Sequence, residues 1–209
     1  MKPQKHKKLL RSFYNRPTLD IAPEILGKYI VYNSDAGRLA ARIVEVEAYI
    51  GQDDPACHAA RGKTKRNEVM FGVPGFTYIY FIYGMYYCLN FVTEPENSPA
   101  ALLLRAAEPE EGYDIMVRNS SSGKPDEMLN GPGKFCRGFG LTKKQNGLDL
   151  TGDVIYIEDR GDVVTNIERS KRIGIKNGAE HLWRFFDADS KAISDYRKHK
   201  TTLTVKYCK

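Results

Sequence analysis

The feature that most constrains the fold is the run FTYIYFIYGMYYCLNFV at residues 76–92. It is dense in aromatic and β-branched residues, which favour strands. Gly84 interrupts the run and predicts a hairpin tip, a bulge or a close backbone approach there. Many tyrosines and one asparagine make the run too polar, and it is too short, for a comfortable membrane span. The run therefore predicts two strands.

The rest of the chain mixes strand and helix patterns without a regular βαβ rhythm. Strands are expected over 38–50, 100–107 and 183–186, and helices within 18–32, at 110–118 and at 134–139. This mixture favours an α+β fold over a doubly wound one. We expect one domain, built on a mainly antiparallel, curved, barrel-like sheet with a protruding β-hairpin and flanking helices. No GxGxxG or GxxxxGK[ST] motif occurs, so a nucleotide-phosphate loop finds no support.

The charge is concentrated at the ends of the chain. The net charge is +6, and five of the 32 basic residues lie within the first eleven positions, which hold no acid. We therefore divide the chain into a basic N-terminal arm (1–17), a central domain (18–196) and a basic C-terminal tail (197–209). A basic arm fits a nucleic-acid or anionic-surface partner, and equally a solvated, partly disordered terminus.

The four cysteines, Cys57, Cys88, Cys136 and Cys208, form no CxxC pair, so zinc-ligand spacing is absent. They are interpreted as reduced thiols of a cytoplasmic protein. The N-terminus has no signal-peptide core, so no secretion signal is expected. If the protein is bacterial, the cytoplasmic location extends to the nucleoid.

The segment RIVEVEAY (42–49) carries two carboxylates on one predicted strand. Alternation along a strand places Ile43, Glu45, Glu47 and Tyr49 on the same face. A partly buried glutamate can act as a general base. From these residues alone, a solvated face of an amphipathic strand is the favoured interpretation, because carboxylates are rarely buried.

Three other features could carry chemistry. Most of the hairpin tyrosines suit a core, but Tyr83 beside Gly84 could wedge between base pairs. Asn90, an amide in an apolar run, is either a fold-specifying group or a hydrogen-bonding group aimed into a pocket. The loop 53–67 contains His58 and a basic cluster suited to phosphates, or simply a solvated loop. Arg105, within an apolar strand, needs an anionic or polar partner.

Taken together, these segments resemble the alkyladenine (3-methyladenine) DNA glycosylase family, of the methylpurine type rather than the helix-hairpin-helix type. The resemblance runs through RIVEVEAY, GQDDPACH, Arg66-Asn67, Met70-Phe71, Pro74-Gly75, YIYFIYGMYYCLN, LLRAAEP and GPGKFC, and more weakly through RIGI (172–175) and WRFF. It covers roughly residues 18–186. The chain departs from the family pattern at Val46, often Thr, and in DADSKAIS after Phe186.

The resemblance assigns a role to each candidate residue. Glu47 would be the general base that positions water, and Arg105 would hold that water or the target phosphate. The remaining candidates form two sets: a base-binding pocket of Tyr49, His58, Tyr80 and Asn90, and a DNA-binding set of Tyr83, Met85 and Arg66. In these roles Tyr83 fills the hole left in the duplex, and Asn90 excludes normal guanine by crowding its 2-amino group.

The implied activity is a monofunctional glycosylase that flips damaged purines from double-stranded DNA and hydrolyses the N-glycosidic bond. No lyase step, metal or cofactor is expected, and the resemblance implies a monomer. Two alternatives remain open. One is a non-catalytic nucleic-acid binding module. The other is a glycosidase on free nucleosides or sugars, which would use Glu45 and Glu47 together.

Overall fold

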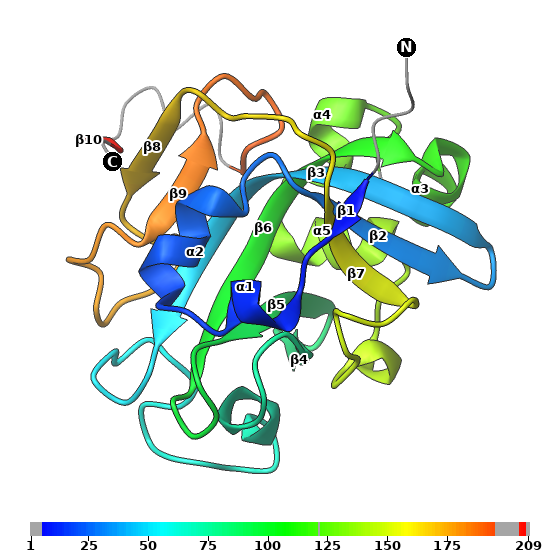
Figure 1. Ribbon diagram of the computed structural model, residues 1–209. Coiled ribbons are helices and arrows are strands. Elements are labelled where there is room, and N and C mark those ends of the chain that lie inside the picture. The colour runs from blue at the N-terminus through cyan, green and yellow to red at the C-terminus, as the bar shows by residue number, and fades with distance from the viewer. Residues whose placement is uncertain (1–5, 121, 195–204, 208–209) are drawn as a thin grey trace.

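The computed structural model describes residues 6–120, 122–194 and 205–207. Within these residues, ten strands form one antiparallel sheet that does not close on itself. The main path runs β1-β7-β2-β3-β6-β5-β4, with β9, β8 and β10 branching from β3 (Figure 1). The expected α+β class with a mainly antiparallel sheet is confirmed. No helix among the described residues is long and apolar enough to cross a bilayer.

The strands are β1 (Lys7–Lys8), β2 (Tyr29–Ser34), β3 (Gly37–Ile50), β4 (Thr77–Ile82), β5 (Tyr86–Thr93), β6 (Ala100–Glu111), β7 (Ile155–Asp159), β8 (Ile167–Ser170), β9 (Arg184–Asp187) and β10 (Val205–Lys206). The helices are α1 (Arg11–Tyr14), α2 (Thr18–Glu24), α3 (Tyr113–Asn119), α4 (Pro125–Met128) and α5 (Pro132–Gly138). Two 3₁₀ turns, η1 (Glu68–Phe71) and η2 (Lys143–Gln145), complete the elements.

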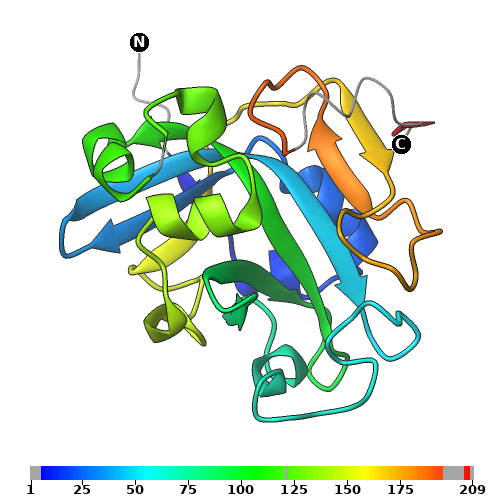
Figure 2. The ribbon, with the colours of Figure 1, turned by 180° about the vertical axis from the view of Figure 1, so that it is seen from behind.

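Helices cover both faces of the central strands β3 and β6. Helices α1 and α2 lie on the face toward the viewer in Figure 1, and α5 lies on the opposite face, seen in Figure 2. With both faces covered, β3 and β6 are buried over most of their length, and they form the centre of the apolar core. Because the interior of this sheet is dry, any charged side chain on β3 or β6 needs a partner there.

A β-bulge at Val44 changes the face pattern expected for β3. The pairing with β6 passes from Ile43 opposite Ala107 to Glu45 opposite Ala106, which leaves Val44 without a position in the ladder. Such an extra residue re-aims the side chains around it. Ile43 consequently joins the main core with Val46 and Ala48. The expectation that Ile43 shares the face of Glu45 is therefore wrong.

The hairpin over 76–92 is confirmed as β4 and β5, with Tyr83 and Gly84 at its tip. The helix expected at 110–118 starts later, at Tyr113, because β6 continues to Glu111. Gly112 makes the junction in a left-handed conformation, with φ of 78°. A Cβ atom at Gly112 would lie 2.6 Å from the carbonyl oxygen of Arg38, so only glycine fits without a shift of backbone.

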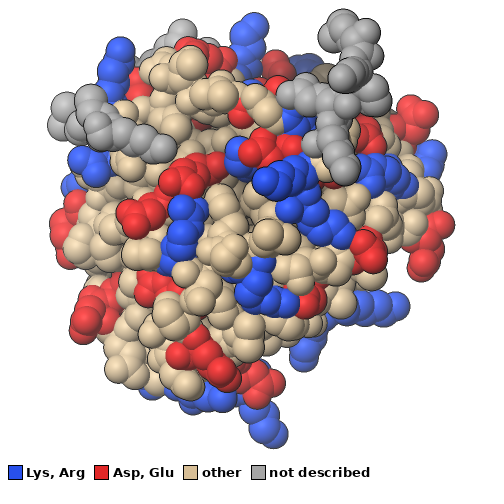
Figure 3. All heavy atoms as spheres, viewed as in Figure 1, with Lys and Arg blue, Asp and Glu red and all other residues tan. Residues whose placement is uncertain are grey.

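The described part of the basic arm packs on the body. Strand β1 pairs with β7, and the Lys8 Nζ atom lies 2.6 Å from the Asp153 carboxylate. Arg11 forms an ion pair with Asp149. Acidic and basic side chains intermingle over the face shown in Figure 3. Within the expected C-terminal tail, residues 197–204 and 208–209, including Cys208, lie outside the described residues; Cys57, Cys88 and Cys136 are buried free thiols.

Candidate active site

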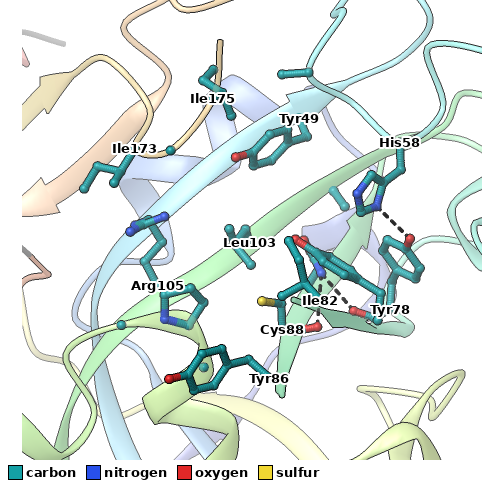
Figure 4. Close-up of a pocket in the computed structure, with 18 of the residues that line it drawn as sticks. Tyr49, His58, Tyr78, Ile82, Tyr86, Cys88, Leu103, Arg105, Ile173 and Ile175 are labelled. Atoms are coloured by element: carbon teal, nitrogen blue, oxygen red, sulfur yellow. Dashed lines mark hydrogen bonds between the residues drawn. The ribbon is translucent and has the colours of Figure 1, made fainter. Parts of the chain in front are cut away.

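A cavity of about 480 Å³ opens beside the β4–β5 hairpin, on the face that carries α5. It is enclosed by the strands β3 to β6, the segment between β3 and β4 that carries His58 and Met70, residues 130–134 at the start of α5, and residues 173–175. Leu103 and Arg105 from β6 lie between Tyr49 on one side and Tyr86 on the other (Figure 4). The lining includes the candidates Tyr49, His58, Tyr80, Tyr83, Asn90 and Arg105. The structure thus brings residues that are far apart in the sequence to one cavity.

Glu47 lies beneath this cavity and is fully buried. The backbone N–H of Ile173 donates to its Oε1 atom at 2.7 Å, and the Tyr49 hydroxyl donates to Oε2 at 2.9 Å. The Arg105 Nη1 atom lies 3.3 Å from Oε2. Glu47 does not itself line the cavity, whereas all three of its partners do. Its carboxylate is therefore held in one orientation directly behind the cavity wall.

Glu45 is also fully buried, so the solvated-face interpretation of this strand is wrong. Its Oε1 atom accepts from Arg105 Nε at 3.0 Å, from Arg184 Nε at 2.6 Å and from the Ser194 hydroxyl at 2.6 Å. Its Oε2 atom accepts from the backbone N–H of Ser194 at 2.5 Å. Burial raises the pKa of a carboxyl, but Arg184 and Arg105 outweigh it and lower the pKa of Glu45 on balance.

Arg105 bridges the two carboxylates, and these are the anionic partners that its position in an apolar strand required. Burial by itself would lower the pKa of its guanidinium, but Glu47 and Glu45 raise the pKa on balance. The guanidinium therefore stays charged inside the protein. Its edge reaches the cavity, which places a fixed positive charge beside Glu47.

Aromatic rings form the walls of the cavity. Tyr49 comes from β3 and Tyr80 from β4, and the His58 ring packs edge-on against Tyr80 with centroids 4.5 Å apart. The Nδ1 atom of His58 lies 2.8 Å from the Tyr78 hydroxyl (Figure 4). Burial, and then the charge of Arg66, lower the pKa of His58 to about 4, so the imidazole is neutral at physiological pH.

Asn90 was expected either to stabilise the fold or to face a pocket, and in the structure it does both. It is nearly buried and its side-chain amide donates to the backbone carbonyl of Tyr78 at 3.0 Å, across the β4–β5 ladder. It also lines the cavity. The amide is thus fixed by the hairpin at the wall of the cavity.

The hairpin tip projects from the molecule next to the cavity mouth. Tyr83 is 76% exposed and Met85 is 64% exposed. Tyr83 and Gly84 both have positive φ, 55° and 68°, which is typical of the tight turns that match strand twist. A tyrosine in this region is strained, and strain of this kind gathers at functional positions. Arg66 lies nearby, its guanidinium carbon 5.2 Å from the Tyr80 ring centroid.

Several residues of the site were not singled out from the sequence. The Ile173 N–H reaches Glu47, and the segment Asn130–Lys134 forms a wall on which Tyr86 packs against Gly133. A fully buried ion pair joins Arg172 to Asp54 beside Tyr49. The sequence did indicate that positively charged partners are needed, because two glutamates on a buried strand require cations. It could not show which arginines serve as these partners, because that depends on contacts between distant parts of the chain.

No group of three or more His, Cys, Asp and Glu side chains with the arrangement of a metal site occurs in the described part of the chain. The chemistry available from the described residues is therefore that of a buried carboxylate, a fixed guanidinium, tyrosine hydroxyls and a neutral imidazole. A carboxylate beside a fixed cation can accept a proton from water and stabilise positive charge on a substrate.

Comparisons with known proteins agree over most of the chain. The family model described as methylpurine-DNA glycosylase matches residues 12–191. A protein from Methanocella arvoryzae is 49% identical over 191 residues, which cover 89% of this chain and 95% of its own length. One from Desulfitobacterium hafniense is 42% identical over 200 residues, covering 90% and 98%. One from Ehrlichia chaffeensis is 46% identical over 185 residues, covering 88% and 95%.

All three relatives carry the provisional name of 3-methyladenine DNA glycosylase. The span of the family model, residues 12–191, includes the strand with Glu47, the tyrosine-rich hairpin, Arg105 and every residue that lines the cavity. The chain belongs to the methylpurine-DNA glycosylase family.

Proposed function

We propose that residues 18–196 of this protein excise damaged, alkylated or deaminated purines from double-stranded DNA by hydrolysing the N-glycosidic bond. The observation that carries the proposal is the pair formed by Glu47 and Arg105, placed directly behind an aromatic cavity and next to an exposed hairpin tip. A cavity of about 480 Å³ falls in the range of small-ligand sites. Family membership gives the reaction class.

Access of the target base to the cavity requires that the nucleotide leave the helix. Extrusion costs a few kcal/mol, and least for a damaged pair, which contributes to selectivity. In this proposal Tyr83 enters the space that the nucleotide vacates, with Met85 beside it in the minor groove and Arg66 on a phosphate. The 76% exposure of Tyr83 leaves its ring free to do so.

Inside the cavity, Tyr49, His58 and Tyr80 would hold the flipped base between their rings. Stacking of this kind contributes about 1–3 kcal/mol per base and tolerates different bases. Asn90 would then discriminate, because an amide fixed by the hairpin crowds the 2-amino group of normal guanine. The neutral His58 adds no positive charge to the cavity, which suits a cationic alkylated purine.

In the chemical step, water attacks the sugar C1′ atom and gives its proton to Glu47. The electron pair of the N-glycosidic bond leaves with the base, so a cationic 3-methyladenine departs as a neutral molecule. Positive charge develops on the sugar, as in glycoside hydrolysis, and the Glu47 carboxylate stabilises it. Because Tyr49 and Arg105 separate Glu47 from the cavity, water reaches it only when one of these contacts opens.

The product is an abasic site, and no amine attacks the sugar, so the enzyme is monofunctional without a lyase step. One chain supplies every residue of the proposed site, which fits a monomer. Neither a metal nor a cofactor has a part in the mechanism.

The test uses a labelled duplex with one hypoxanthine and a parallel methylated duplex, incubated with wild type, Glu47→Gln and Glu110→Gln. Each sample is split and analysed with and without hot alkali. Glu110 is an exposed carboxylate on β6 and is the matched control. We expect strand breaks only after alkali, at the same rate for wild type and Glu110→Gln, and at least about 100-fold slower for Glu47→Gln.

Other results would redirect the assignment. Salt-dependent duplex binding without base release would support a non-catalytic binding module. Hydrolysis of free nucleosides, without preference for duplex DNA, would support a nucleosidase. The structure argues against a joint role of both glutamates in that reaction, because both oxygens of Glu45 are engaged by Arg105, Arg184 and Ser194.

A further inference from the structure

Glu45 has no part in the mechanism above, yet its carboxylate accepts more hydrogen bonds than that of Glu47. It is fully buried and accepts four hydrogen bonds, from two arginines and from both donors of Ser194. It does not line the cavity. A buried carboxylate is costly to desolvate, so this concentration of donors requires a physical reason.

The partners of Glu45 form a chain of contacts that ends at Glu47, the proposed general base. Arg184 holds Glu45 and also donates to Ser170 Oγ at 3.0 Å and to the Ser194 carbonyl at 3.1 Å. Glu45 holds the Nε atom of Arg105 at 3.0 Å. The other side of the same guanidinium presents Nη1 to Glu47 at 3.3 Å. Ser194 Oγ reinforces this placement, 3.2 Å from both Nε and Nη2 of Arg105.

The charges within this chain of contacts balance. Glu45 and Glu47 carry one negative charge each, and Arg105 and Arg184 carry one positive charge each. If Glu45 lost its charge, Glu47 would be the one negative charge left among these four groups, opposite two arginines. Arginine pairs most favourably with a carboxylate in a bidentate geometry. Arg105 would then turn toward Glu47 and contact its carboxylate through two nitrogens, so that the contact would open less readily to admit water.

We propose that Glu45 is a positioning residue, which holds the guanidinium of Arg105 so that a single nitrogen faces Glu47. Arg184 and Ser194 hold Glu45 in turn. This role rests on the proposed glycosylase function and deepens it. It also gives a function to the segment after Phe186, which departs from the family pattern. In this segment, Ser194 donates two hydrogen bonds to Glu45 on β3.

The test compares wild type, Glu45→Gln and the double variant Glu45→Gln/Arg184→Gln. For each we would measure the single-turnover rate on the lesion duplex, the Kd for that duplex, and Tm. Glutamine keeps the size of Glu45 and removes its charge. We expect Glu45→Gln to excise about 10- to 100-fold more slowly, because misplacement of a catalytic group by about 1 Å costs that much. Its Kd should stay within about threefold of wild type, since Glu45 is remote from the DNA surface.

The double variant separates positioning from stability. Glu45→Gln leaves an arginine without its full anionic pairing and should lower Tm by roughly 10 °C. Removing the Arg184 charge as well restores the balance of the remaining pair, Arg105 and Glu47. If Glu45 positions Arg105, the double variant regains most of the lost Tm but stays slow. If Glu45 only supports the fold, rate and Tm recover together, and this result would overturn the proposal.

Ser194→Ala is the second, milder variant, in case Glu45→Gln does not fold. It removes the hydroxyl that touches both Glu45 and Arg105 and changes no charge. We expect a rate several-fold below wild type with unchanged Kd; an unchanged rate would contradict the proposal. If wild type excises the lesion and these variants are equally fast, the role of Glu45 is overturned and the glycosylase assignment remains intact. No excision by wild type would overturn both.

Discussion

Replacement of Asp54 by asparagine tests the buried ion pair that joins two loops above β3. The Asp54 carboxylate receives Arg172 Nη1 at 2.5 Å and Nη2 at 2.7 Å, and both side chains are completely buried. The same carboxylate accepts the backbone N–H groups of Ile50 and Ala56. Burial would lower the pKa of Arg172, but the hydrogen bond to Asp54 raises it on balance. Because an arginine guanidinium is not deprotonated in proteins, Arg172 remains charged when its partner is changed.

The magnitude follows from this geometry. Breaking a buried pair by neutralising one partner costs about 3–5 kcal/mol. Asparagine keeps one carbonyl oxygen that can still accept from Arg172, so we expect about 3 kcal/mol, at the lower end of that range. For a chain of 209 residues this corresponds to a fall in Tm of roughly 6–12 °C.

A functional effect should accompany the loss of stability. The guanidinium carbon of Arg172 lies 4.6 Å from the Tyr49 ring centroid, and the next residue, Ile173, donates its N–H to Glu47. Release of Arg172 would loosen the contacts that Tyr49 and Ile173 make with Glu47, the proposed general base. We therefore expect excision to slow by about tenfold at a temperature where the variant is folded, with duplex affinity little changed.

The assay is thermal unfolding followed by circular dichroism, with single-turnover excision measured well below Tm. Asp53→Asn is the matched control, because Asp53 is adjacent in the same loop and exposed. Surface changes of this kind usually alter stability by less than about 0.5 kcal/mol. A fall in Tm of less than about 2 °C for Asp54→Asn, or one equal to that of the control, would refute the reasoning.

Three further outcomes follow from the site. Gly133→Ala would place a Cβ atom 2.7 Å from the Tyr86 ring, so we expect displacement of the hairpin and about tenfold weaker lesion-duplex binding, whereas Gly123→Ala, with open space around it, should bind normally. Tyr83→Ala should weaken binding to the lesion duplex about tenfold without a change in Tm, because the ring is exposed; unchanged affinity would contradict its role as a wedge. The pKa of His58 is about 4, so the unfolded chain binds a proton below about pH 6.5 that the folded protein does not. Stability should thus fall from about pH 6.5 toward pH 4, by a small amount because His58 is exposed to solvent, and urea denaturation of His58→Gln should show a shallower fall.

Local chemistry explains why the hairpin and the general α+β class could be predicted. Strand preference over 76–92 and a turn at Gly84 depend on neighbouring residues, and both strands formed where expected. Tyr83 could be singled out for the same reason, because a tyrosine beside a turn glycine has few places to be buried. The helix start at Tyr113 could not be placed as well, because β6 extends through pairing with β3, which lies about 70 residues earlier in the chain.

The amino-acid sequence by itself determined which chemical groups are present: two glutamates on one strand, an arginine in another, and a ring-rich hairpin with a sharp turn. The family resemblance singled out Glu47, but only the tertiary structure shows how the surroundings of Glu45 differ from those of Glu47, and those of Asp53 from those of Asp54. In each pair the residues are chemically equivalent, and their roles differ through partners more than 100 positions away, Arg184 and Ser194 for Glu45 and Arg172 for Asp54. Burial and ion pairing at such separations arise only when the sheet has assembled, because they depend on which distant strands exclude water together.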